Sequence, residues 1–216
     1  MTRPPRPRTL TGLCLALLLW AAAASPALAA TLRIASAFDP QTMDPHALAL
    51  LYHTRVVHQV YESLVNRDAG FKLEPALATG WAMSGPTRWR FKLRPGVTFH
   101  DGAAFSADDV VFSITRALGP SSQRSFTLKG IAEVRKIDDL TVDFVLSAPD
   151  AVLPDKLGNV PMVSKAWCLQ HGVEKSQDFN AKQETFTVRN ANGTGPFKLL
   201  RYEPDVRVQL QRFDGW

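Results

Sequence analysis

Hydrophobic and polar residues alternate along much of the chain, a pattern typical of half-buried β-strands. In residues 88–94, large apolar side chains face one way and basic side chains face the other. Residues 141–146 alternate in the same way, and with residues 131–137 they predict a hairpin that has an acidic turn. Three more strands are expected: around Leu32 and Ile34, over 197–202 and over 206–213.

Helical spacing separates these strands. Over residues 48–65 the apolar positions recur at i, i+3, i+4 and i+7, which predicts an amphipathic helix. A second helix is expected over residues 106–118, because Ser106 is placed to cap its first turn. The acidic pair Asp108-Asp109 follows this cap, where the positive end of the helix favours carboxylates. Shorter helices are expected over 152–157 and 164–171, and the interleaving of helices with strands indicates a mixed α/β fold.

The first 29 residues have the composition of an export signal. A basic start is followed by an apolar run over residues 13–24, and then by Ala27-Leu28-Ala29. We expect cleavage after Ala29 and a periplasmic mature protein that begins at residue 30. Cys14 lies early in the apolar run, whereas a lipid-modified cysteine follows such a run. Cys168 is then the only remaining cysteine, so no internal disulfide is expected.

The net charge of the chain is smaller once the predicted signal is left out. The 25 basic and 20 acidic residues give a net charge of +5. Arg3, Arg6 and Arg8 belong to the signal, and without them the balance is 22 to 20, or +2. The remaining charges are interspersed, so nucleic acid is not an expected partner.

The motifs of common exported enzymes are absent from the sequence. It contains no G-x-S-x-G turn and no H-E-x-x-H pair. His53 and His58 are five residues apart, which on a helix places them about 140° from each other. Cys168 is expected to be a small buried hydrophobic residue. We therefore expect no catalytic residues, no metal site and no cofactor.

Several stretches together resemble a known family. Met43-Asp44-Pro45-His46 comes first, Phe99-His100-Asp101-Gly102 lies in the middle, and Gly193-Thr194-Gly195-Pro196 lies near the end. The chain resembles the family 5 extracellular solute-binding proteins, the dipeptide-, oligopeptide- and nickel-binding components of bacterial ABC importers. The full set of matching stretches is 43–46, 60–65, 74–78, 89–102, 105–113, 192–197 and 210–216.

The resemblance implies an architecture. Family members have two lobes joined by a hinge and enclose their ligand between them, in a fold of the type II periplasmic binding proteins. Residues 30–216 would form the N-terminal part of the domain: the first part of lobe I, with an inserted subdomain over about residues 68–187. Lobe II would be absent, and because the chain stops at Trp216 directly after a predicted strand, we expect a fragment.

The resemblance also implies ligand-binding residues. Phe38, Asp39, Met43 and His46 match positions near the ligand in family members, with Phe38 packing on a ligand side chain and Asp39 pairing with a peptide amine. The alternative is a structural loop fixed by its prolines, with Phe38 and Met43 in the core. Two more candidates, Arg124 and Phe126, match the nickel-binding branch; the alternative for Arg124 is a solvated loop arginine.

The expected function is binding without catalysis. We expect the periplasmic component of an ABC importer that binds di- or oligopeptides by hinge closure and has ABC permease subunits as partners. Three alternatives remain: a binder of nickel chelates or another small solute, a ligand-sensing adaptor for a membrane receptor, and an exported hydrolase with an unfamiliar site.

Overall fold

The computed structural model describes residues 31–216, and it divides the chain into residues 1–36 and residues 37–216. The predicted signal over residues 1–29 lies outside the described residues. Residues 31–36 form neither helix nor strand, so the strand predicted around Leu32 and Ile34 is wrong. Their side chains are 83% and 81% exposed. An alternating pattern forms a strand only where another strand supplies hydrogen bonds, and no strand of the described residues pairs with this segment.

Within residues 37–216, the largest sheet is a four-stranded antiparallel one with the order β3-β4-β6-β5. Its strands are β3 (Ala78–Gly85), β4 (Arg88–Leu93), β5 (Ile131–Asp138) and β6 (Thr141–Leu146). The sequence predicted β4 and the β5–β6 hairpin, which the structure confirms. It gave no signal for β3, because none of the residues of this strand is charged and polar and apolar positions do not alternate clearly.

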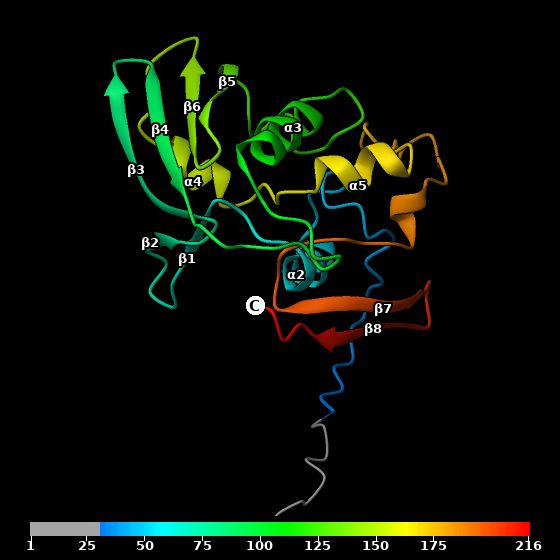
Figure 1. Cartoon of the computed structure of the whole chain (residues 1–216). Helices are drawn as coiled ribbons and strands as arrows, with labels where there is room; N and C mark the ends of the chain where they lie inside the picture. The colour runs from blue at the N-terminus through cyan, green and yellow to red at the C-terminus, as the bar shows by residue number, and fades with distance from the viewer. Residues whose placement is uncertain (1–30) are drawn as a thin grey trace, which may run out of the picture. The chain divides into compact units, whose positions relative to one another are not determined.

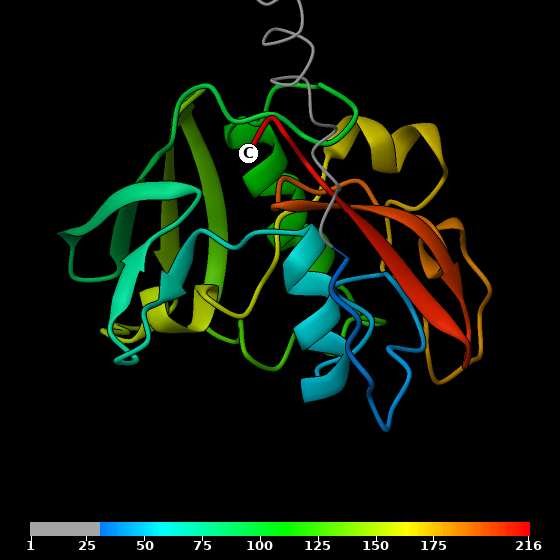
Figure 2. The ribbon, with the colours of Figure 1, turned by 90° about the horizontal axis from the view of Figure 1, so that it is seen from below.

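Two smaller sheets each contain one hairpin. The first pairs β1 (Val65–Arg67) with β2 (Leu73–Pro75). The second pairs β7 (Phe197–Glu203) with β8 (Arg207–Arg212), as the sequence predicted. In Figures 1 and 2 the four-stranded sheet and the β7–β8 hairpin lie at opposite sides of this unit, with α2 between them.

The helices are short. They are α2 (Leu51–Val60), α3 (Ala107–Ala117), α4 (Leu153–Leu157) and α5 (Lys165–Gln170), with a 3₁₀ turn over Phe186–Val188. Three of the four predicted helices agree with the structure to within two residues at each end. The fourth, α2, is shorter than the predicted span of 48–65, because the backbone becomes extended at its end and then enters β1.

The acidic pair at the start of α3 serves as a cap. The Asp109 carboxylate accepts a hydrogen bond from the backbone N–H of Ser106 at 2.9 Å, and the Ser106 hydroxyl oxygen accepts from the N–H of Asp108 at 3.3 Å. These bonds satisfy donors that the first helical turn leaves unpaired. The capping interpretation of this pair is confirmed.

Two hydrophobic clusters hold the unit together. The larger joins the four-stranded sheet to α3 and α4 and contains Phe91, Phe99, Ile114 and Phe144, each with 0% exposure. The second joins α2 and α5 to the β7–β8 hairpin around Val57, Tyr61 and Cys168. Among the described residues, no helix is long and apolar enough to cross a membrane.

Candidate functional site

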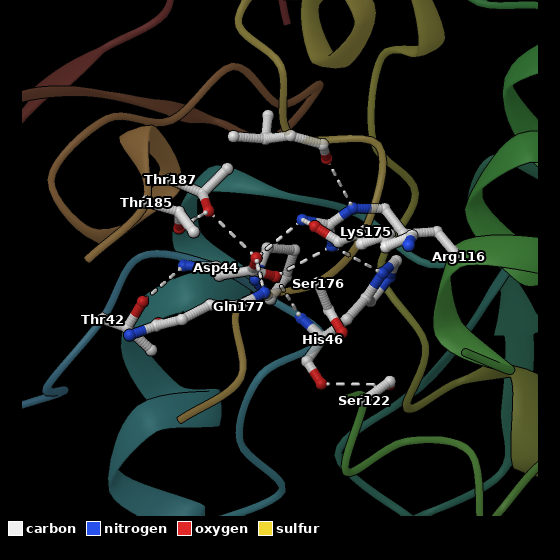
Figure 3. Close-up of polar contacts among 12 residues, drawn as sticks. Thr42, Asp44, His46, Arg116, Ser122, Lys175, Ser176, Gln177, Thr185 and Thr187 are labelled. Atoms are coloured by element: carbon white, nitrogen blue, oxygen red, sulfur yellow. Dashed lines mark hydrogen bonds and ion pairs between the residues drawn. The ribbon is translucent and has the colours of Figure 1, made fainter. Parts of the chain in front are cut away.

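A buried ion pair attaches the loop over residues 37–50 to the rest of this unit (Figure 3). Asp44, in this loop, faces Arg116 on α3, and their side chains are 0% and 1% exposed. The two groups meet side by side, with Nη1 at 2.9 Å from Oδ1 and Nη2 at 2.6 Å from Oδ2. A buried pair is stable only when its geometry is good and its remaining polar atoms are satisfied.

The Arg116 guanidinium meets that condition, because an acceptor faces each of its five N–H donors. Two donors bond to Asp44, and a third bonds to Nδ1 of His46 at 3.0 Å. The other two donate to the backbone carbonyls of Val173 at 3.1 Å and Lys175 at 3.2 Å. One side chain therefore ties the loop to the segment that follows α5.

The Asp44 carboxylate is equally well supplied with donors. It accepts from the backbone N–H of His46 and of Gln177, and from the hydroxyl of Thr187, each at 3.0 Å. Burial opposes ionisation of this carboxyl, but the charge and hydrogen bonds of Arg116 outweigh it, so its pKa lies far below the ordinary value. The site holds an ionised carboxylate that solvent does not reach.

His46 completes the network as a neutral ring. Its Nε2 lies 2.8 Å from the carbonyl oxygen of Pro161, while its Nδ1 faces a donor of Arg116. These partners assign the proton to Nε2, because Nδ1 must accept. Burial, together with the charge of Arg116, lowers the pKa of His46 to about 3.

The loop over residues 120–129 is attached to the same structure. Arg124 donates to the carbonyl of Pro45 at 3.3 Å and to the hydroxyl of Thr54 at 3.0 Å. The Gln123 N–H donates to the carbonyl of His46 at 3.1 Å. Burial lowers the pKa of Arg124 to about 10, so the group stays charged at neutral pH. Two loops that are about 80 residues apart in sequence are thus joined directly.

Two aromatic side chains project from these joined loops. Phe38 is 66% exposed and stacks on Tyr52 of α2, with 5.3 Å between ring centroids. Phe126 is 75% exposed, and the Lys129 ammonium lies 4.8 Å from its ring centroid. Side chains of this kind supply contact area for a ligand at low entropic cost.

The six predicted site residues therefore fall into three groups. Met43, His46 and Arg124 are buried beneath the surface, whereas Phe38 and Phe126 are exposed. The Asp39 carboxylate accepts hydrogen bonds from the Tyr202 hydroxyl and from the backbone N–H of Asp205, which ties the loop to the β7–β8 hairpin. Ligand contact by these six residues stays a prediction.

Sequence reasoning missed the roles of Asp44 and Arg116. Asp44 is part of the motif Met43-Asp44-Pro45-His46 but was not predicted as a site residue, because nothing in the sequence indicates that its carboxylate is buried. Arg116 occupies the last turn of an amphipathic helix, where a basic residue is expected on the solvent side. Only the fold brings the two residues together.

Two other stretches that carry the family resemblance, 99–102 and 192–197, contact each other. The Asn192 side chain exchanges hydrogen bonds with Asp101, accepting from its backbone N–H at 3.2 Å and donating to its carboxylate at 2.7 Å. The His100 ring lies 2.9 Å from the carbonyl oxygen of Gly195. An added Cβ at Gly193 would lie 2.0 Å from the carbonyl oxygen of Val60, so only glycine fits there. These motifs position the end of α2 against the β7–β8 hairpin.

The described residues offer little reactive chemistry. None of them form a group of three or more His, Cys, Asp or Glu side chains that could hold a metal ion. Burial raises the pKa of the Cys168 thiol to about 12, so it stays protonated at neutral pH. The polar side chains of the site instead join its two loops.

Comparison with known families fits this description. The model described as "Bacterial extracellular solute-binding proteins, family 5 Middle" matches residues 72–216, well over half of the chain. The chain belongs to this family. Its mixed α/β fold is that of the type II periplasmic binding proteins, and it covers only about a third of the similar solved structures.

The proteins that this family 5 chain resembles differ from one another in their described roles and ligands. The HTH-type transcriptional regulator SgrR of Yersinia enterocolitica is 34% identical over 165 residues, which are 76% of this chain and 26% of that protein. The chain therefore spans about a quarter of that relative's length. NikZ from Campylobacter jejuni, solved with Ni(L-His), is 25% identical with a TM-score of 0.70, over 85% of this chain and 35% of NikZ. DppA from Helicobacter pylori, solved with the peptide STSA, is 26% identical with a TM-score of 0.67, over 81% and 37%.

Proposed function

We propose that this family 5 chain acts in the periplasm as the substrate-binding component of an ABC importer for di- or oligopeptides. One observation carries the proposal: Phe38 and Phe126 are exposed on two loops that buried charges hold rigidly together. A preorganised apolar surface binds without the entropic cost of ordering its own loops. The similarity to DppA, which was solved with a peptide, supports peptides as the ligand class.

We propose different roles for the six predicted site residues. Phe38 and Phe126 contact the ligand, whereas Met43, His46 and Arg124 hold the loops that carry these rings. The Asp39 carboxylate pairs with a peptide amine only if it shares the oxygens that now accept from Tyr202 and Asp205. Hinge closure needs the second lobe, which residues 30–216 do not supply; its closure over the ligand would present the closed form to ABC permease subunits.

The test is peptide binding by the full chain, measured by calorimetry with a pool of tetrapeptides. Phe38→Ala and Phe126→Ala should each weaken binding about tenfold, because each removes an aromatic contact. Phe71→Ala is the matched control, since Phe71 is 78% exposed in the turn between β1 and β2. Equal affinity in all three variants would refute this placement of the ligand.

Export is tested separately. Expression in a Gram-negative host should yield a periplasmic protein whose first residue is Ala30. A protein retained in the cytoplasm with residues 1–29 intact would contradict the periplasmic role.

Two further functions have specific support. The similarity to NikZ supports a nickel–histidine complex as ligand, and calorimetry with that complex compares it directly with peptides. The 34% identity to a transcriptional regulator supports a ligand-sensing role. Deleting the gene separates sensing from import: sensing predicts changed transcription with normal peptide uptake, whereas import predicts lost uptake.

A further inference from the structure

Two histidines on α2 are buried and take no part in the hydrogen-bond network of the site. His53 is 0% exposed, and neither of its ring nitrogens makes a hydrogen bond to another described residue. His58 follows five residues later, and its buried Nε2 also has no hydrogen-bond partner among those residues. Leaving buried polar atoms unpaired is costly, so the two rings call for an explanation.

The charges that act on these rings come from the two loops of the site and from α2 itself. Arg124, on the loop over residues 120–129, disfavours a proton on either ring. Asp44, on the loop over residues 37–50, favours a proton on His53 through its carboxylate and its nearby backbone, and His58 disfavours it. Burial is the main effect, and with Arg124 it lowers the pKa of each histidine to about 4. Both rings are therefore neutral at pH 7.

Arg124 is a buried cation that lacks a carboxylate partner of its own. It is 5% exposed, and within residues 31–216 its hydrogen bonds reach neutral acceptors, the carbonyl of Pro45 and the hydroxyl of Thr54. Thr54 follows His53 directly, so the bond from Arg124 to α2 ends beside the buried ring. Asp44, the carboxylate that acts on His53, is already paired with Arg116.

A proton on His53 would place a second positive charge near Arg124, in a region that solvent does not reach. Like charges repel more strongly where water is excluded, and burial itself disfavours a charged ring. Both costs fall when Arg124 leaves Thr54 and the loop over residues 120–129 moves away from α2, because both charges then reach water. Phe126 lies on that loop and would move with it.

We propose that protonation of His53 and His58 detaches the loop over residues 120–129 from α2, and that acid thereby releases a peptide bound at Phe38 and Phe126. The release of peptide rests on the proposed function, whereas the detachment of the loop does not. Detachment also differs from general unfolding in acid, because the loop opens while the four-stranded sheet stays folded.

The first experiment is hydrogen exchange of the full chain, followed by mass spectrometry at pH 7.5 and pH 5 and normalised to the intrinsic exchange rate at each pH. A histidine whose pKa rises from about 4 to 6.5 on opening makes opening about thirtyfold more favourable at pH 5 than at pH 7.5. We expect protection of residues 120–129 to fall at least about tenfold, and that of β4 (Arg88–Leu93) to change less than about threefold. An unchanged loop, or an equal fall in both segments, would overturn the proposal.

Variants assign the effect to the two rings. His53→Leu has a similar volume and leaves no unpaired polar atom, so the fold should accept it. It should remove most of the acid-induced loss of protection, and His53→Leu combined with His58→Leu should remove all of it. His171→Leu is the matched control, because this half-buried histidine follows α5 and should leave the loss intact. A full loss in the double variant would refute the role of the histidines, and if that variant fails to fold, the comparison of loop with sheet in the unaltered protein decides.

Peptide dissociation tests the second half of the proposal. The probe is Ser-Thr-Ser-Ala, the peptide with which DppA was solved, and its dissociation rate is measured by surface plasmon resonance. Because the peptide leaves from the opened loop, the rate should rise at least about tenfold from pH 7.5 to pH 5, and should stay constant in the double variant. Equal rates at both pH values would refute acid release. No binding at pH 7.5 would contradict the peptide function and with it acid release, whereas hydrogen exchange would still decide whether the loop detaches.

Discussion

Replacing Arg116 by methionine should destabilise the protein more than any change to its surface charges. The substitution keeps an unbranched side chain of similar reach but removes five donors and a buried positive charge. Asp44 would keep three donors and lose its counter-charge, in a position with 0% exposure. Breaking a buried pair in this way costs about 3–5 kcal/mol, a large share of the about 5–15 kcal/mol that stabilises a domain.

Urea unfolding followed by circular dichroism measures the effect. With a slope of about 2 kcal/mol per molar urea, the midpoint should fall by about 2 M. Arg135→Met is the matched control, because Arg135 pairs with Glu133 at 2.6 Å but is 51% exposed. Exposed pairs contribute at most about 1 kcal/mol, so this control should shift the midpoint by less than about 0.5 M.

A double variant tests the cause. Asp44→Leu combined with Arg116→Met removes both charges, so it should cost clearly less than the sum of the two single substitutions. Some destabilisation should remain, because the N–H groups of His46 and Gln177 lose their acceptor. If Arg116→Met costs no more than Arg135→Met, or if the two single effects simply add, the pair does not hold the loop as argued.

Three further predictions concern pH, packing and reactivity. Burial lowers the pKa values of His46 and His53 from 6.5 to about 3 and about 4. Between these values and pH 6.5, the two histidines are protonated in the unfolded chain but not in the folded chain. The free energy of unfolding should therefore be highest above pH 6.5 and should fall below that pH, by up to about 1.4 kcal/mol per pH unit for each histidine. A melting temperature that stays constant between pH 6.5 and 4 would contradict this prediction. Gly193→Ala should lower the melting temperature strongly, because its Cβ would lie 2.0 Å from a carbonyl oxygen, whereas Gly80→Ala meets nothing within 4 Å and should not. Cys168 is 1% exposed and its thiol has a raised pKa, so in the chain that begins at residue 30, where it is the only cysteine, Ellman's reagent should label it only after denaturation. Rapid labelling of that chain in its native state would show that the α5 region is open.

Much of the local structure followed from sequence patterns. Alternation placed β4, β6, β7 and β8, because a half-buried strand needs opposite faces of opposite polarity. The Ser106 cap placed the start of α3. The pattern around Leu32 was equally clear and wrong, since alternation does not supply the neighbouring strand that its backbone needs.

The candidate site was predictable only in outline. Motif resemblance selected the loops around Phe38 and Arg124, and the structure joins these loops through Pro45, Thr54 and His46. It did not distinguish exposed from buried members, because a phenylalanine, a histidine or an arginine in a loop is compatible with either place. Hydrogen-bond partners decide this, and they lie tens of residues away.

The family, the α/β class and most of the elements could be predicted from the amino-acid sequence, because they depend on short-range periodicity and on motifs read in order. The buried pair of Asp44 and Arg116, which are 72 residues apart, could be recognised only in the folded chain. The physical reason is that burial and charge pairing depend on distances through space, which no local pattern of residues encodes.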